Sequence, residues 1–313
     1  MQVCLFIEPH RGASFDTQLA FASHADARGF FGLFRSDHYQ SFGKGIPPGP
    51  TDAWVVLAGL AQTTERIRLG TLVTSATFRL PGPLAITVAQ VDHMSGGRVE
   101  FGIGAGWYDR EHTSYGIPFP SLAERLDRLA EQLEIITGLW GTPTGQRFTY
   151  AGRYYRLTDS PALPKPLQRP RPPVIIGGRG LRRTPELAAQ YADEYNAVFL
   201  SPQEARHRFN AVGEACDRLG RVGAPVRLSG GVPVACGRTD AEARRRAEHL
   251  YEAESALPLG KAALVGPPEL LVERIGELQA AGAGRVYLRI GDLSDLDHLD
   301  LIADEVFPKV GVA

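Results

Sequence analysis

Short apolar runs alternate along this chain with longer segments in which apolar residues recur at helical spacing. The apolar runs predict eight strands, at residues 3–8, 32–35, 67–73, 98–104, 173–177, 194–200, 226–235 and 285–290. The segments between and after them predict helices at 16–28, 52–64, 84–94, 122–139, 185–192, 202–219, 240–254 and 268–281. Such regular alternation is typical of parallel strands that are connected by helices.

The clearest helical pattern begins at Leu122. One face of this helix is apolar, and acidic and basic residues fill much of the remainder. The apolar face comprises Leu122, Leu126, Leu129, Leu133, Ile136 and Leu139. Packing against the protein core is the simplest interpretation of this stripe, and a subunit interface is the alternative.

Residues 140–173 interrupt the alternation before the fifth strand. This segment is rich in aromatic residues, glycines and prolines, and we expect a long insertion with a hairpin at 147–155. Long loops in compact domains often cover binding sites. We therefore expect the insertion to lie over the mouth of the fold, with a purely structural arm as the alternative.

Eight strands alternating with eight helices predict one (β/α)8 TIM barrel domain over residues 1–313, with the insertion after the fourth strand/helix unit. A doubly wound sheet is the alternative fold. A chain of 313 residues has the length that such a barrel commonly uses.

Composition narrows the range of partners and sites that we expect for this chain. The formal net charge of −1 does not suggest a nucleic-acid or membrane partner. The three cysteines are far apart, and the eight histidines lack metal-site spacing, so we expect no metal site and no disulfide. We find no signal peptide and no run of membrane-spanning length. We therefore expect a soluble cytoplasmic protein that acts on a small molecule as a homodimer.

In a TIM barrel the active site lies where the strands end, so the residues after each predicted strand are the candidates. Asp37 and His38 follow the second strand, and an acid beside a histidine can bind a cofactor ring or move a proton. Helix capping is the alternative, which these residues alone favour. After the third strand comes a hydroxyl-rich run that includes Thr74 and can simply be the edge of the strand, and Arg79 beyond it can meet an anion.

Glycines follow the fourth and fifth strands. Gly102, Gly104 and Gly106 stand at alternate positions before Trp107, which indicates that backbone closely approaches another group there. That group is a planar cofactor ring, or the glycines form a tight exit from the strand packed under aromatic residues.

After the fifth strand, glycines and arginines lead into a helix expected to start near Thr184. This arrangement suits a phosphate, or is a turn with solvated arginines. The residues concerned are Gly177, Gly178, Arg179, Arg182, Arg183 and Thr184.

The order of these motifs resembles that of the luciferase-like flavin and deazaflavin oxidoreductases, in the branch usually classed as coenzyme F420-dependent. The likeness covers nearly the whole chain. Its motifs are residues 36–38, 69–79, 96–107, 176–178 followed by 188–196, and then 107–112 and 115–120.

The resemblance implies a TIM barrel enzyme that moves a hydride between reduced F420 and an organic substrate, with reduction of a C=C or C=N bond. An FMN-dependent monooxygenase of the same fold is the first alternative, and a non-catalytic cofactor-binding barrel is the second. Arg79, Arg110, Arg179, Arg182 and Arg183 are expected at one rim of the barrel. Their charge favours F420, which carries an anionic glutamate tail beyond its phosphate, over FMN.

The resemblance also assigns roles to residues. Asp37 and His38 would face the deazaflavin ring, and Leu72–Val73 matches a non-prolyl cis peptide that backs it. Trp107 stands where some deazaflavin dehydrogenases carry a glutamate as the acid, so sugar oxidation is not expected. The expected catalytic residues are His38, Asp37 and Trp107. The expected cofactor-binding residues are Asp37, Leu72, Val73, Thr74, Arg79, Gly104, Ala105, Gly106, Gly177, Gly178, Arg179, Arg182, Arg183 and Thr184.

Overall fold

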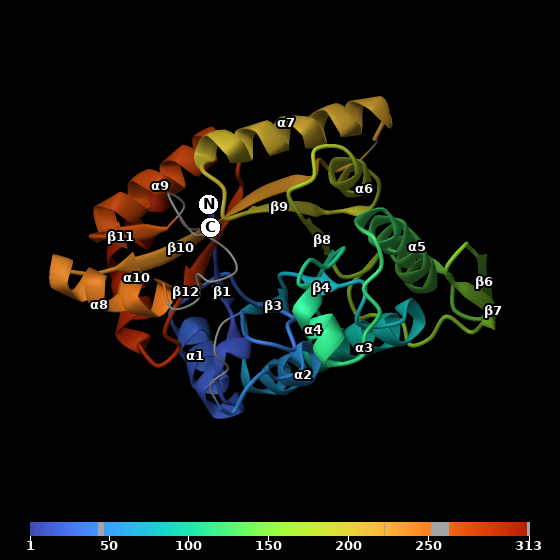
Figure 1. Cartoon of the computed structure of the whole chain (residues 1–313), viewed down its shortest axis with the longest axis horizontal. Coiled ribbons are helices and arrows are strands. Elements are labelled where there is room, and N and C mark those ends of the chain that lie inside the picture. Colours follow the sequence, from blue (N-terminus) through green and yellow to red (C-terminus); the bar gives the residue numbers. More distant parts are fainter. Residues whose placement is uncertain (43–46, 222, 252–262, 312–313) are drawn as a thin grey trace.

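A closed barrel of parallel strands forms the centre of the protein (Figure 1). The computed structural model describes residues 1–42, 47–221, 223–251 and 263–311. Within these residues, eight strands pair in the order β1-β2-β3-β5-β8-β9-β10-β12, and β12 pairs again with β1. This closure confirms the TIM barrel and excludes the doubly wound sheet. The strands are β1 (Gln2–Ile7), β2 (Gly32–Arg35), β3 (Arg68–Thr71), β5 (Val99–Gly104), β8 (Val174–Gly177), β9 (Glu194–Val198), β10 (Arg227–Cys236) and β12 (Arg285–Ile290).

The predicted helices are confirmed, most of them to within three residues at each end. They are α1 (Phe15–Ala27), α2 (Ala53–Thr63), α3 (Pro81–Met94), α5 (Leu122–Gly141), α6 (Arg183–Tyr191), α7 (Pro202–Arg218), α8 (Asp240–Tyr251) and α9 (Pro268–Ala280). The last residues of the helix expected at 240–254 lie outside the described residues. Sequence patterns missed α4 (Asp109–Ser114), α10 (Leu296–Glu305), α11 (Phe307–Val310), a 3-10 turn (Pro9–Arg11) and the short strands β4 (Thr74–Ser75) and β11 (Leu264–Gly266).

Side-chain caps start several of the helices at the ends of the strands. The Asp52 carboxylate accepts hydrogen bonds from the first backbone N–H groups of α2. Ser121 accepts from the N–H of Glu124, and Ser201 and Glu204 form a reciprocal capping box. Each cap satisfies N–H groups that have no partner within the helix. The caps therefore fix where the chain turns back from the mouth of the barrel.

The insertion lies beside the barrel and not over its mouth. Its strands β6 (Phe148–Ala151) and β7 (Arg156–Ser160) form the expected hairpin, which lies outside α5 in Figure 1. Glu131 of α5 accepts hydrogen bonds from backbone N–H groups of the hairpin turn, and Gln168 bonds Asp92 at the end of α3. The expectation of a lid is wrong, because α5 carries the chain away from the mouth before the insertion starts.

Charged side chains fill the amino end of the barrel interior. Arg285, at the start of β12, forms ion pairs of 2.6 Å with Glu100 and 2.7 Å with Glu194. The Tyr287 hydroxyl donates a hydrogen bond of 2.7 Å to Glu194. Burial acts to raise the pKa of Glu100, but the guanidiniums of Arg285 and Arg68 outweigh it and lower that pKa. Because this cluster closes the amino end, only the carboxyl end can open into a cavity.

In the part of the chain that the structure describes, no helix combines the length and apolar content needed to cross a membrane. In the same residues, no three His, Cys, Asp or Glu side chains form a group that could hold a metal ion.

Replacing Arg285 with methionine should strongly destabilise the barrel. The substitution Arg285→Met leaves Glu100 and Glu194 buried without their common partner, and breaking such a pair costs about 3–5 kcal/mol. Urea denaturation measures the change. The matched control is Arg244→Met, which removes the same charge from an exposed pair and should leave stability almost unchanged. Equal free energies of unfolding for the two variants would show that the buried ion cluster does not stabilise the barrel as proposed.

Candidate active site

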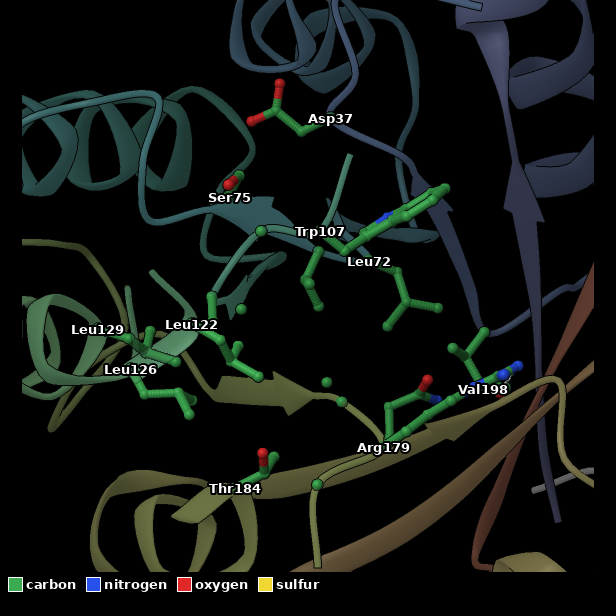
Figure 2. A pocket seen from close by; sticks show the side chains of 18 of the residues that line it. Asp37, Leu72, Ser75, Trp107, Leu122, Leu126, Leu129, Arg179, Thr184 and Val198 are labelled. Atoms are coloured by element: carbon green, nitrogen blue, oxygen red, sulfur yellow. Dashed lines mark hydrogen bonds between the residues drawn. The ribbon is translucent and has the colours of Figure 1, made fainter. Parts of the chain in front are cut away.

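A cavity of about 440 Å³ opens at the carboxyl end of the barrel (Figure 2). Its walls come from the ends of β2, β5, β8 and β9, the segment after β3, and the first turns of α5 and α6. Most predicted site residues line it: Asp37, His38, Leu72, Val73, Gly104, Ala105, Gly106, Trp107, Gly177, Gly178, Arg179 and Thr184. The tertiary structure therefore gathers residues that are up to 147 positions apart, from Asp37 to Thr184.

Four predicted residues do not line the cavity. Thr74 is fully buried beside it, and Arg79 is ion-paired with protein carboxylates. Arg182 is exposed, 3.7 Å from Glu186, and Arg183 forms an ion pair of 2.7 Å with Asp127. Arg79, Arg182 and Arg183 thus meet acids of the protein itself.

The Asp37 carboxylate is held by protein groups. Both of its oxygens accept from the Arg79 guanidinium, and the Thr74 hydroxyl donates to it at 2.9 Å. Arg79 also donates to Asp52 at 2.6 Å. Asp37 is 1% exposed, and in Figure 2 it lies on the opposite side of the cavity from Thr184. The arrangement suits a residue that fixes the shape of the site, since both of its oxygens already have partners.

The floor of the cavity is Val73, seated among glycines. The Leu72–Val73 peptide is cis, as the resemblance implied. A Cβ on Gly102 would lie 3.1 Å from a Val73 methyl, on Gly104 2.9 Å, and on Gly177 3.2 Å. The close approach expected from the glycine spacing is therefore real. Val73 is the approaching group at Gly104 and Gly177, whereas at Gly102 the Thr71 carbonyl oxygen would lie nearer still, at 1.9 Å. A larger residue there would displace the floor of the cavity.

A histidine and a buried glutamate form a pair at one wall. Nδ1 of His38 lies 2.9 Å from Oε1 of Glu111, and the backbone N–H of Tyr39 donates to Oε2 at 2.9 Å. Glu111 is 1% exposed, so its carboxylate is shielded from water, whereas His38 is partly exposed to the cavity. The His38 ring meets Trp107 edge-on, with 5.8 Å between centroids. With Nδ1 engaged by the carboxylate, Nε2 is the nitrogen that can serve a ligand.

Sequence reasoning missed Glu111. It lies one helical turn after Trp107, and nothing in the local pattern connects it with His38, 73 positions earlier. A scan for acids on the first turn after the glycine run is the one signal that points to it. Asn196, Val198 and Phe199 of the predicted strand 194–200 also line the cavity without having been assigned to it.

A second histidine supports His38 from behind. His10 is 1% exposed, and its Nδ1 lies 2.9 Å from the Ser36 hydroxyl. Burial, and then the charge of His38, lower the pKa of His10 well below its ordinary value. His10 is therefore neutral and adds no charge beside His38, whose ring centroid is 5.1 Å away.

The apolar stripe of α5 divides between the core and the cavity. Its later members, such as Leu133 and Ile136, are buried in the core as expected. Leu122 and Leu126 instead line the cavity, and Leu129 belongs both to the core and to the cavity wall. Figure 2 shows these three leucines on the side away from Val198. The interpretation as core packing is therefore correct only in part.

The start of α6 offers backbone donors to the cavity. No side chain caps this helix, so its first N–H groups are available to a bound anion. A Cβ on Gly180 would lie 2.7 Å from the Thr184 hydroxyl, so glycine is needed for the loop to close on the helix. Arg179 donates weakly to the carbonyls of Val198 and Phe199, at 3.4 and 3.3 Å, and brings a positive charge to the same wall.

Comparison with known proteins agrees with this geometry. The family model described as luciferase-like monooxygenase matches residues 1–260. An F420-dependent glucose-6-phosphate dehydrogenase from Microbacterium testaceum (strain StLB037) is 37% identical over 178 residues, which cover 56% of this chain and 51% of that enzyme. An FMNH(2)-dependent dimethylsulfone monooxygenase from Pseudomonas putida is 34% identical over 141 residues, 44% of this chain and 36% of that enzyme. The chain spans about half the length of the curated relatives it matches.

Solved structures share the fold over almost the entire chain. An F420-dependent secondary alcohol dehydrogenase, in complex with an F420-acetone adduct, has a TM-score of 0.84. It is 20% identical and is matched over 99% of this chain and 98% of its own. At that identity the likeness concerns the fold.

A methyl group at Gly104 should destabilise the floor of the site. In Gly104→Ala the new Cβ would lie 2.9 Å from Val73, and overpacking of this kind costs about 1–3 kcal/mol. Adding Val73→Ala should recover part of the loss. The control is Gly82→Ala in α3, where nothing lies within 4 Å and stability should not fall. Urea denaturation compares the three variants, and a Gly104→Ala protein as stable as Gly82→Ala would refute the packing argument.

Proposed function

Since the chain belongs to the luciferase-like monooxygenase family, we propose that it is an oxidoreductase that transfers a hydride between reduced coenzyme F420 and a small organic substrate. The observation that carries the proposal is one cavity with the His38–Glu111 pair at one wall and the uncapped start of α6 at another. A flat redox ring with a phosphorylated tail needs both features. Similarity to F420-dependent glucose-6-phosphate dehydrogenases supports this choice of cofactor.

The residues present fit such a group. The side chain of Val73 and the backbone of residues 104–106 would back the ring, because Val73 is apolar and Gly104 and Gly106 have no side chain that would project toward it. Gly177, Gly178 and Arg179, with the first N–H groups of α6, would hold the phosphate. This apolar floor and cationic wall match the two ends of the proposed cofactor.

Protein groups would supply the proton and exclude water. When bound, the deazaflavin carries the hydride that passes to or from the substrate. His38 moves the accompanying proton at Nε2, because Glu111 holds Nδ1 and so sets the orientation of the ring. In the reducing direction, one carbon of a C=C or C=N bond gains the hydride, and its partner atom gains the proton. Trp107 and Leu122 would shield the reacting atoms from solvent.

An apolar substrate suits this cavity better than a sugar phosphate. Leu122, Leu126 and Phe199 face into it, and Trp107 stands where the resemblance places a glutamate acid in some deazaflavin dehydrogenases. Reduction of a C=C or C=N bond in an apolar molecule is therefore the reaction we propose. That the substrate is a small molecule and that the chain forms a homodimer remain predictions.

An FMN-dependent monooxygenase is the second candidate. The similarity to the dimethylsulfone monooxygenase favours it, because that enzyme is named for reduced FMN. The similarity to the F420-dependent glucose-6-phosphate dehydrogenases, which is higher in identity and covers more residues, favours F420. Among the arginines expected at the rim, Arg79 and Arg183 pair with protein carboxylates, whereas Arg179 donates to carbonyl oxygens and keeps its charge at the cavity wall. A catalytically inactive cofactor-binding barrel is the third candidate, which turnover with any substrate excludes.

The variant His38→Ala should lower kcat about a hundredfold or more, because a positioned proton donor contributes at least that much. Glu111→Gln keeps a hydrogen-bond partner for His38 but removes the charge, and we expect a smaller loss, on the order of tenfold. Turnover is followed by oxidation of reduced F420 with a panel of unsaturated carbonyl and imine substrates.

The matched control for these two variants is His207→Ala, which removes an exposed histidine of α7 and should leave turnover unchanged. Circular dichroism checks the fold of each protein. Unchanged kcat in His38→Ala would remove His38 from the mechanism.

Cofactor titration by fluorescence quenching should show tighter binding of F420 than of FMN, and the affinity for F420 should fall as salt rises. The double variant Arg182→Ala/Arg183→Ala should weaken F420 binding by up to about fivefold per side chain and affect a tail-free deazaflavin less. Arg179→Ala should weaken every phosphorylated ligand. The control, Arg244→Ala/Arg245→Ala on α8, removes equal charge from exposed positions outside the cavity. Tighter binding of FMN than of F420 would exclude the F420 assignment.

A further inference from the structure

A line of short hydrogen bonds runs from the cavity to a buried histidine of α4. Ser75, which lines the cavity, has its hydroxyl oxygen 2.6 Å from that of Thr77. The Thr77 oxygen is 2.6 Å from Nε2 of His112. At the far end, Nδ1 of His112 is 2.7 Å from the carbonyl oxygen of Tyr108. We name these three side chains, Ser75, Thr77 and His112, the relay.

The far end sets the direction of every donor in the relay. A carbonyl oxygen only accepts, so Nδ1 of His112 must carry the hydrogen that points to Tyr108. In the neutral imidazole, Nε2 is then an acceptor, and the Thr77 hydroxyl must donate to it. The Thr77 oxygen is left to accept from Ser75. The one hydrogen of the Ser75 hydroxyl is therefore committed to Thr77.

His112 is in the neutral form that this argument requires. Burial lowers its pKa below the ordinary value. The Tyr108 carbonyl and the Glu111 carboxylate act in the opposite direction, and Arg125 of α5 and His38 add to the lowering. Phe78 and Phe119 pack against the ring, with centroids 5.1 and 4.4 Å away, and keep water from it.

We propose that His112, acting through Thr77, holds Ser75 as a hydrogen-bond acceptor that faces the cavity. His112 is thus a positioning residue, and Ser75 selects ligands that present an N–H or O–H group at this wall. The ligand part of this inference rests on the proposed function, since rings of the flavin and deazaflavin type carry both N–H donors and carbonyl acceptors. Without the relay, the Ser75 hydroxyl would turn freely and would also accommodate a carbonyl.

Backbone packing keeps the relay in place. Gly106 adopts φ +78°, and a Cβ on it would lie 2.3 Å from the Ser75 oxygen and 3.2 Å from that of Thr77. The last glycine of the run therefore makes room for the relay, in the same way that Gly104 makes room for Val73.

A double-mutant cycle tests the coupling. Thr77→Val is nearly isosteric but has no hydroxyl, and it should weaken F420 binding about fivefold, the effect of one net hydrogen bond. In a Ser75→Ala background the same change should have no effect, because Thr77 acts only through Ser75. His112→Phe keeps the ring packing and should match Thr77→Val, whereas Thr77→Ser keeps the hydroxyl and should bind like the wild type. Fluorescence quenching gives each dissociation constant.

Several outcomes would overturn the relay. Additive effects of Thr77→Val and Ser75→Ala would show that Thr77 does not work through Ser75. Loss of affinity in Thr77→Ser equal to that in Thr77→Val would show that the hydroxyl is not the important group. If Thr77→Val weakened F420 binding and His112→Phe did not, His112 would not be the residue that sets the direction of the hydrogen bonds in the relay.

Failure of the relay can be separated from failure of the proposed function. Imidazole ¹⁵N chemical shifts of the ligand-free protein report which nitrogen of His112 carries the hydrogen. The relay requires Nδ1–H in the wild type and in Ser75→Ala, and an Nε2–H tautomer would refute it whatever the cofactor. If the wild type binds neither F420 nor FMN, the proposed function fails while the tautomer still decides the relay.

Discussion

The buried ion cluster at the amino end of the barrel determines where a site can form. Arg285 pairs with Glu100 and Glu194 among the first residues of three different strands, and all three side chains are at most 2% exposed. Each charge is costly to bury alone, so the members hold one another and the strands that carry them in place. These charged side chains fill the amino half of the barrel interior. Val73 forms the floor of the cavity in the carboxyl half. The cavity is the space that remains above Val73.

Around that cavity the protein has paired most of its own charges before any ligand arrives. Asp37 and Asp52 share Arg79, Glu111 holds His38, and Asp127 holds Arg183. Pairing fixes side-chain positions in advance, which lowers the ordering cost when a ligand binds. What remains for a ligand is a small set of directed groups: Nε2 of His38, the first N–H groups of α6 and the oxygen of Ser75. Apolar side chains make up most of the other walls.

This distribution of groups connects the cavity with the chemistry of its family. Proton transfer needs one oriented group that is shielded from water, and the buried Glu111 provides the orientation for His38. A phosphate needs donors that do not have to move, and an uncapped helix start next to glycines provides them. The leucines of α5 that line the cavity are the reason for proposing an apolar substrate, although several relatives are named for glucose 6-phosphate.

The amino-acid sequence by itself determined the barrel and the mouth at which its site lies. Periodicity is a local property, and alternating strands and helices with right-handed connections give parallel strands whose carboxyl ends share one side. Residues after each strand therefore converge, and the length of the chain and the order of its motifs favoured the barrel, which the pairing of β12 with β1 then confirmed over the doubly wound sheet. Tertiary structure alone decided the partners. Glu111 meets His38 across 73 positions, Val73 occupies the space beside Gly104, and Leu122 faces the cavity while Leu133 faces the core. These outcomes depend on strand register and on where each helix lies along the barrel axis. The local sequence pattern specifies neither of them.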